Sequence, residues 1–430
     1  MILAAVLPAW AETEVRISPS AAVGMIGEDL FSELRLELAV QHEWFDIGVV
    51  APLALRLIDT PPGDRAGDIG GIIRGRDWDE VADIGRVIGA IRLGRPSDTV
   101  RAYLGPLTDL TLGHGSIVER YSNQIDRDRQ RAGALLRVEL PWLDGELGWS
   151  NVFGADLGWA RVELLPTSRN LEGGEGPSLG ASLVGDFTAP RCLWPCARTA
   201  PLVTLGVDAE WAFYFSQRLR LAPYVDFNGQ FDRGVGLSAG ARATLYVPFG
   251  AHPNIQISLI GEYTLSSDGY TPRYFTALYD SERFATQIGP GAQPKALTTI
   301  HGGSGGRLGL EVDVPHLARF AAFGELRPSP YDGDFFFTFN LPVTRWVRAG
   351  ALFLQRQIRD GRDLFSNRAL WLLSAEIAVR IADNWNAYGQ LGHTYRLARL
   401  GAGVESGLDW MLGVRYTWSS LRIAPDAPGE

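Results

Sequence analysis

Two short segments of the sequence combine a histidine with a nearby serine, a pairing found in nucleophilic enzymes. They are His114-Gly-Ser116 and His301-Gly-Gly-Ser304, and both fall in loops between more regular segments. A catalytic serine also needs a third group that orients the histidine and donors that stabilise an oxyanion. Neither segment carries such a signature. The sequence therefore predicts polar loop residues here, no catalytic residue and no enzyme.

Two cysteines are the next reactive groups. Cys192 and Cys196 lie four positions apart in the segment 190–196. A metal site would need further ligands, and no histidine lies nearby in the sequence. In an exported protein this spacing predicts a local disulfide that closes a loop, with free thiols as the alternative.

Two further segments have the composition of ion-binding loops. Asp126-Arg-Asp-Arg-Gln-Arg131 alternates in charge, and its arginines favour a solvated strand entrance over a calcium site. The glycine-rich segment 287–307 does not open a helix after a parallel strand, as a phosphate-binding loop would. The sequence therefore predicts no metal and no cofactor.

The overall composition excludes one class of partner. The chain of 430 residues has a net charge of −9, and its acidic residues are spread along its length. Proteins that bind nucleic acid need a basic face against the phosphates, so no nucleic-acid partner is expected. No run of eighteen apolar residues occurs, which argues against a transmembrane helix.

The N-terminus resembles the end of a secretory signal. Residues 1–11 are mostly apolar and close with Ala9-Trp-Ala11, a small-x-small pattern before Glu12. Because a positively charged start is missing, the segment is predicted to be a truncated signal peptide. A short apolar leader with no targeting role is the alternative.

Strict alternation of apolar and polar residues is the strongest pattern in the chain. In a strand, neighbouring side chains point to opposite faces, so a sheet between lipid and water alternates residue by residue. Segments that alternate over nine or more residues are 33–41, 204–215, 235–247, 255–265, 371–381 and 408–418. The chain is therefore predicted to be all-β.

Three features favour a lipid-embedded barrel over a soluble β-sandwich. Most segments of ten to fourteen residues match a tilted bilayer crossing and exceed the usual strand length. Aromatic residues such as Trp211, Trp385 and Trp418 lie near segment ends, as an interfacial girdle requires. Glycine and alanine accompany charges on the polar face, which suits a wet wall. We expect a transmembrane antiparallel up-and-down β-barrel of about 18–20 strands.

The connections between these segments alternate in length. Short ones are predicted at 42–44, 95–98, 141–144, 216–217, 342–344 and 382–384, and long ones at 59–83, 113–130, 266–303 and 358–368. Barrels have short periplasmic turns and long outside loops. The count is 20 strands, or 18 because 151–180 is ambiguous. The barrel is assigned to 12–418, with both ends periplasmic and a disordered tail at 419–430.

This pattern resembles the outer-membrane β-barrel proteins of Gram-negative bacteria, including the porins. The resemblance covers nearly the whole chain and rests on no specific motif. It departs from the common pattern at the end, where a tail follows Trp418. The segment 103–115 looks like a stretch in uncharacterised proteins of this type. The resemblance implies an outer-membrane location and contact with outer-membrane lipid, and carries no signal for an oligomeric state.

Ionisable residues on the polar face are the predicted pore lining. As a group, they either form a field that selects solutes or merely solvate the lumen and pair across strands. These residues are Arg35, Glu37, Arg92, Arg137, Asp208, Glu210, Arg218, Arg220, Asp226, Arg242, Glu262, Arg348, Arg356, Glu376, Arg380 and Arg415. The long segments 59–83, 113–130 and 287–307 are candidates to cover the mouth or fold inward as a constriction.

The leading hypothesis is a pore that passes hydrophilic solutes, because polar inner faces and this number of strands leave an aqueous channel. One alternative is an exit pore for a secreted polysaccharide, since mixed arginine and carboxylate walls also suit an acidic polymer. The other is a structural or interaction barrel that loops plug, without transport.

Overall fold

The computed structural model describes most of the chain. The described residues are 13–60, 68–154, 156–165, 176–193, 198–250, 252–287, 292–298, 300–327, 333–341, 346–358, 363, 370–397 and 404–419. They form one antiparallel sheet in which each strand from the first to the twentieth pairs with its neighbours in sequence.

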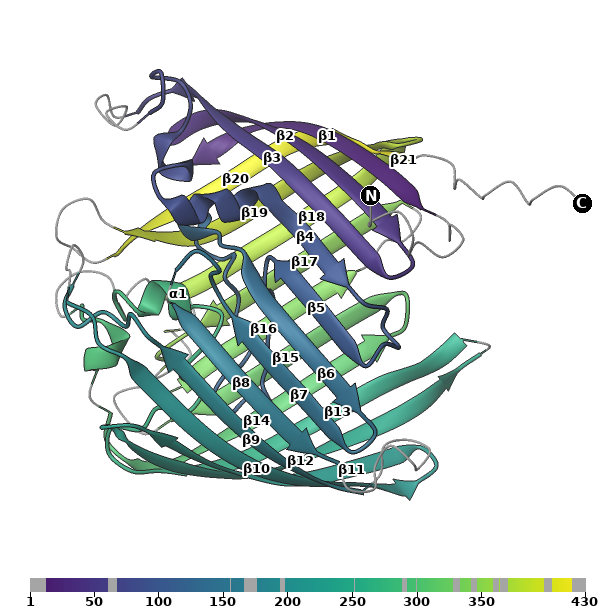
Figure 1. Ribbon diagram of the computed structural model, residues 1–430, viewed down its shortest axis with the longest axis vertical. Helices are drawn as coiled ribbons and strands as arrows, with labels where there is room; N and C mark the ends of the chain where they lie inside the picture. Colours follow the sequence, from purple (N-terminus) through teal and green to yellow (C-terminus); the bar gives the residue numbers. More distant parts are fainter. Residues whose placement is uncertain are drawn as a thin grey trace, which may run out of the picture.

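The strands follow each other around the wall in sequence order (Figure 1). The first ten are β1 Glu14–Ile26, β2 Asp29–His42, β3 Phe45–Ile58, β4 Ile88–Leu93, β5 Val100–Gly105, β6 Gly133–Leu140, β7 Leu143–Trp149, β8 Leu157–Leu164, β9 Gly176–Asp186 and β10 Leu202–Ser216. The others are β11 Leu219–Gln230, β12 Gly234–Phe249, β13 His252–Ser266, β14 Gly303–Val314, β15 Ala318–Leu326, β16 Gly333–Leu341, β17 Val347–Gln355, β18 Trp371–Ala382, β19 Trp385–Leu397, β20 Val404–Tyr416 and β21 Trp418–Ser419.

The sheet closes on itself between its first and last strands. β1 pairs with β20 from Ser20 to Met25, and with the two-residue β21 at Arg16 and Ile17. β20 and β21 therefore act as one wall strand, which makes a closed barrel of 20 strands. At this seam a Cβ on Gly24 would lie 1.8 Å from the carbonyl oxygen of Trp410, so the close approach requires glycine.

The two faces of the wall differ in chemistry, as the alternation predicts. On β12, Val235 and Leu237 are exposed on the outer face, whereas the inward Ser238 and Thr244 are buried. On β11, Phe227 is 50 % exposed and its neighbour Asn228 is 2 % exposed. In water these large apolar side chains would be exposed to solvent, which is unfavourable. The outer face is therefore a surface for lipid.

Aromatic side chains gather near the short-turn end of the outer face. Trp142, Trp211, Phe215, Trp346 and Trp385 are all large exposed residues at or near strand ends on this side. Aromatic rings of this kind sit at the boundary between hydrocarbon and headgroups. The predicted girdle is therefore present at this interface.

The connections divide between the two ends as predicted, with exceptions. β2–β3, β6–β7, β10–β11 and β18–β19 are joined by two-residue turns at one end, and the long segments 59–87, 106–132 and 267–302 lie at the other. At the long-loop end, however, 27–28 and 231–233 are also short. The ambiguous region 151–180 contains two wall strands, β8 and β9, which decides the count in favour of 20.

The predicted strand length is wrong for one part of the wall. β4 to β8 have only six to eight residues each, below the expected ten to fourteen. A 3₁₀ helix, Val81–Val87, precedes β4 and exposes Val81 and Ile84.

Several predictions concern residues outside the described ranges. The signal peptide at 1–11 and the turn at 342–344 are among them, and so is the tail apart from Ser419, which pairs with Arg16 in the wall. These stay predictions. In the described ranges, no helix is long and apolar enough to cross a membrane.

The two faces of β18 allow a direct test of the lipid-facing assignment. Ile377 lies at mid-strand on the outer face and is 51 % exposed, whereas Ser374 faces the lumen. An arginine at the bilayer midplane costs about 2–4 kcal/mol. We expect Ile377→Arg to lower the free energy of unfolding, measured for the protein in lipid vesicles, by that amount. Ser374→Arg should lower it by less than about 1 kcal/mol. Equal losses would contradict the assignment.

Candidate functional site: an internal plug

Two long connections fold into the lumen and contact each other. The main-chain nitrogen of Phe275 donates to the carbonyl oxygen of Ile117 at 3.1 Å, and Glu119 donates back to Phe275 at 2.9 Å. Arg273 donates to Ser116 in the same way at 2.9 Å. We call residues 106–132 together with the described part of 267–302 the plug. Its helical turn α1, Tyr279–Glu282, lies at the long-loop end of the barrel (Figure 1).

The plug has an apolar core that it shares with the inner wall. One cluster joins plug residues to wall residues of β8, β9 and β10; its main members are Leu107, Leu110, Leu112, Ile117, Val118, Tyr121, Tyr274, Phe275 and Tyr279 against Leu157, Trp159, Val184 and Leu202. A second cluster packs Leu278 and Phe284 against Ile260, Phe323, Phe336, Leu354 and Leu372. Each large side chain contributes about 1.5–3 kcal/mol by such burial. The plug is therefore part of the folded barrel.

Arg273 carries the central charged contact between plug and wall. Its guanidinium lies 3.1 Å from Glu119 of the plug, 3.0 Å from Glu325 of β15, and against Glu262 of β13. The Arg273 side chain is 1 % exposed. A guanidinium this deep is stable only when carboxylates surround it, so removal of one partner leaves a buried charge without compensation.

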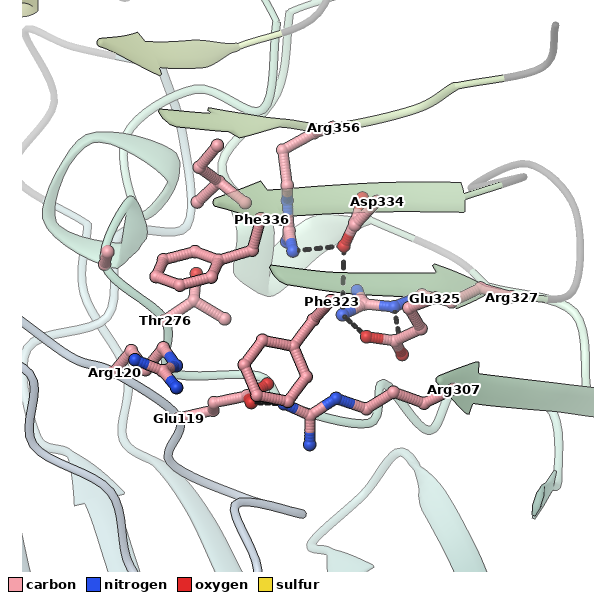
Figure 2. A pocket seen from close by; sticks show the side chains of 12 residues that line it. Glu119, Arg120, Thr276, Arg307, Phe323, Glu325, Arg327, Asp334, Phe336 and Arg356 are labelled. Atoms are coloured by element: carbon pink, nitrogen blue, oxygen red, sulfur yellow. Dashed lines mark hydrogen bonds and ion pairs between the residues drawn. The ribbon is translucent and has the colours of Figure 1, made fainter. Parts of the chain in front are cut away.

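The charged contacts continue along the wall from β14 to β17. Figure 2 shows Arg307 reaching Glu119, and a chain in which Arg327 bridges Glu325 and Asp334 while Arg356 pairs with Asp334. These groups line a small cavity of about 40 Å³, room for very few water molecules.

The chain's single lysine is buried within the second segment of the plug. Lys295 pairs with Glu282 beneath the rings of Tyr274 and Tyr279, and Arg356 lies 2.8 Å from Glu282 on the other side. Burial lowers the pKa of the Lys295 amine to about 7, although Glu282 lies against it. The Lys295 side chain is 6 % exposed, so the rate at which its amine reacts with a reagent in solution reports whether the plug is seated.

His114 holds the first segment of the plug against the opposite wall. Its ring nitrogens lie 2.8 Å from Asp226 of β11 and 3.2 Å from Glu210 of β10, and the ring stacks on Tyr224 at 4.0 Å. Burial by itself lowers the pKa of His114, but the hydrogen bonds to Asp226 and Glu210 outweigh burial and raise the pKa to about 9. Gly113 has a φ of 55°, and a Cβ there would lie 2.8 Å from Arg161, so this turn requires glycine.

The segment 126–131 also fixes the plug, contrary to the prediction of a solvated strand entrance. Asp126 and Arg131 are each 4 % exposed. Arg131 pairs with Asp83 at 2.8 Å, and Arg74 pairs with Asp128 at 2.6 Å. Asp128 and Arg131 therefore have partners on the segment that follows β3, whereas Arg127 pairs with Glu33 of β2.

Open space remains on two sides of the plug. A cavity of about 470 Å³ lies between the plug and the inner wall formed by β8 and β10 to β15, with Arg161, Arg220, Arg242 and Glu311 in its lining. A second cavity of about 530 Å³, which we call the vestibule, lies at the short-turn end between β1, β2 and β17 to β20. The vestibule contains Arg16, Arg348, Arg380 and Arg415 against Glu37 and Glu376.

Three arginines of this region lie in one row of the sheet. The pairings Arg35–Ser20, Ser20–Arg415, Arg415–Asn386 and Asn386–Arg380 place them on β2, β20 and β18. In the described part of the chain Arg16, Arg35, Arg348 and Arg415 form no ion pair, whereas Arg380 contacts Asp383 at 2.7 Å. The vestibule therefore has an excess of positive charge.

The predicted pore-lining residues separate into distinct groups. Arg35, Glu37, Arg348, Glu376, Arg380 and Arg415 face the vestibule side, and Glu210, Arg220 and Arg242 line the cavity beside the plug. Asp208, Asp226, Glu262 and Arg356 are inward-facing but pair with other residues under the plug or beside it. Arg92 and Arg137 pair with Asp46 and Glu146 on the wall.

Arg218 is the exception, because it lies in the exposed turn between β10 and β11 and not on the wall. Sequence spacing missed Glu119, Arg273, Lys295, Arg307, Glu325, Arg327 and Asp334. One signal was available: 335–337 is three phenylalanines, which places Phe336 on the inward face of β16 between the polar Asp334 and Thr338. A large apolar side chain on this otherwise polar face indicates that something covers it inside the barrel.

Only one of the two cysteines of the predicted disulfide lies within the described residues. Cys192 lies in the connection between β9 and β10, and Cys196 falls outside the described residues. The pairing stays a prediction.

Comparison with known proteins gives a likeness in fold alone. No protein-family model and no curated protein matches the chain. Among solved structures, Pseudomonas aeruginosa OccK11 (OpdR) is 10 % identical over 96 % of this chain and 98 % of its own, with a TM-score of 0.37. The ferric enterobactin receptor PfeA of the same organism is 9 % identical over 96 % and 82 %, with a TM-score of 0.39.

The barrel itself defines the class of protein. A closed antiparallel wall with an apolar exterior, an aromatic girdle and a polar, charged interior is an outer-membrane β-barrel of the Gram-negative type. More particularly, the chain is a porin-like barrel whose lumen contains a plug built from two of its own connections.

The contact at Arg273 predicts how firmly the plug is seated. We expect Arg273→Met to lower the free energy of plug opening by about 3–5 kcal/mol, because three carboxylates lose their cation. Acylation of Lys295 by an amine-reactive ester, followed by mass spectrometry, should then become at least about a hundredfold faster. Arg319→Met is the control, since Arg319 is 74 % exposed and pairs only with Asp313 at 2.9 Å. Equal acylation rates in all three proteins would contradict the assignment.

Proposed function

We propose that this protein is a plugged channel that passes small hydrophilic solutes, preferably anions, across the outer membrane. The observation that carries the proposal is the open space beside the plug and in the vestibule, about 470 and 530 Å³. Charged side chains line both spaces, and a barrel of this size leaves an aqueous interior. A purely structural barrel has no need of such cavities.

The preference for anions rests on the charge of the vestibule. Four arginines and two glutamates line it, a surplus of two positive charges. Guanidinium groups bind carboxylates and phosphates in a bidentate manner, and clefts of one charge sign concentrate the opposite ion. Small solutes with a carboxylate or phosphate are therefore the proposed cargo.

A polysaccharide exit pore fits this interior less well. A polymer chain needs a continuous wide path, whereas the plug is packed into the lumen by two apolar clusters and the contacts of Arg273. The proposal also includes no catalytic step, because both ring nitrogens of His114 contact carboxylates and His301 is exposed in a connection.

The plug predicts the size of the conductance. We expect the wild-type barrel to give small single-channel currents in planar bilayers. Replacement of 270–300 by a short Gly-Ser linker should raise the conductance several-fold, because the apolar and ionic contacts that fill the lumen are lost. A folded wild type without conductance would refute an open channel; conductance only after the deletion would show a sealed barrel.

The vestibule predicts the ion selectivity. The double variant Arg348→Gln/Arg415→Gln leaves two arginines against two glutamates, so the surplus charge falls to zero. We expect the chloride-to-potassium permeability ratio, measured from the reversal potential in a salt gradient, to fall from above one towards one. Arg348→Lys/Arg415→Lys keeps the charge and should keep the ratio. An unchanged ratio in the glutamine variant would contradict the proposed preference.

A further inference from the structure

His114 lies where the plug meets β10 and β11, with a carboxylate against each ring nitrogen. Nδ1 is 2.8 Å from Oδ1 of Asp226, and Nε2 is 3.2 Å from Oε2 of Glu210. The ring is fixed by its stack on Tyr224, with an angle of 10° between the two planes. The stack leaves the imidazole few other orientations, and in this one each ring nitrogen points at a carboxylate.

A third carboxylate belongs to the same cluster. Asp208 of β10 is the register partner of Asp226 of β11, and both face inward. Ligand atoms of His114, Asp208 and Asp226 all lie within 4.8 Å of one another. Two carboxylates directly opposite in a sheet repel each other, and Arg161, 2.6 Å from Asp208, offsets part of that repulsion.

Asp226 supplies a second and independent sign of a ligand. The residue is 1 % exposed, and its Oδ2 has no hydrogen-bond partner in the described part of the chain. The amide nitrogen of Asn228, the next inward residue of β11, also has none. Leaving a buried carboxylate oxygen unsatisfied costs free energy, which a bound cation would recover.

We propose that His114, Asp208 and Asp226 form a binding site for a first-row divalent metal ion such as Zn²⁺. One imidazole nitrogen and two carboxylate oxygens are a donor set that Zn²⁺ uses. Bonds of about 2.0–2.2 Å place ligand atoms roughly 3.4 Å apart, so small side-chain rotations would close the cluster. The ion takes the place of the proton that His114 shares with Asp226.

The surroundings favour a site with an open coordination position. His114 and Glu210 line the cavity of about 470 Å³, which has room for water as a further ligand. One ligand comes from the plug and two come from adjacent wall strands, so the ion joins the plug to the barrel. The site is independent of what the channel carries.

Zn²⁺ titration of the folded, detergent-solubilised chain by isothermal titration calorimetry tests this site. We expect one Zn²⁺ per chain in the wild type, and an affinity at least tenfold lower in His114→Gln and in Asp226→Asn. Heat-modifiable migration on a gel checks that each variant is folded. If His114→Gln does not fold, Asp226→Asn, which keeps the shape of the side chain, decides.

The variant His316→Gln is the matched control, because this histidine is exposed in the turn between β14 and β15, outside the plug. It should retain the wild-type affinity. The proposal is wrong if the wild type binds no Zn²⁺, or if the control loses binding while the folded His114 or Asp226 variant keeps it.

Discussion

Hydrocarbon offers no hydrogen bonds, so every backbone amide and carbonyl within the bilayer must find its partner in the protein. This constraint explains why the sheet closes, with Ser20 to Met25 of β1 paired to β20 and Arg16 and Ile17 paired to β21. Closure then fixes the register of every strand. It also gives each residue one of two environments, lipid outside or the lumen inside, and the alternation along the chain follows from that choice.

A wall of 20 strands encloses more space than its own side chains fill, and the plug fills part of that space. Apolar packing against Trp159 and Phe336 holds the plug in the lumen. Arg273 and Glu282 fix its position, because Arg273 pairs with Glu262 and Glu325 of the wall and Glu282 pairs with Arg356 next to β17. Buried ion pairs add little to stability by themselves but strongly penalise a misplaced partner. The plug therefore specifies the shape of the remaining aqueous path.

Sequence reasoning succeeded where one local rule decides the structure. Alternation identified the wall and its inward face, since neighbours such as Leu237 and Ser238 differ in environment for a reason visible in sequence. It failed for the plug, because Glu119 and Arg273 are far apart in sequence and belong to no periodic segment. It also took the charges at 126–131 for solvated ones, since partners such as Asp83 appear only in three dimensions. An apolar residue on the inward face of β16 was the available hint.

Cross-linking across the closing seam tests the central claim, a closed barrel, most directly. With Cys192 and Cys196 replaced by serine, Val23→Cys/Leu412→Cys places two thiols on register partners of β1 and β20. Ala21→Cys/Leu34→Cys does the same within the β1–β2 hairpin and forms in an open or closed sheet. A closed barrel predicts an oxidised cross-link in both pairs in cell envelopes. A cross-link in the hairpin pair alone would contradict it.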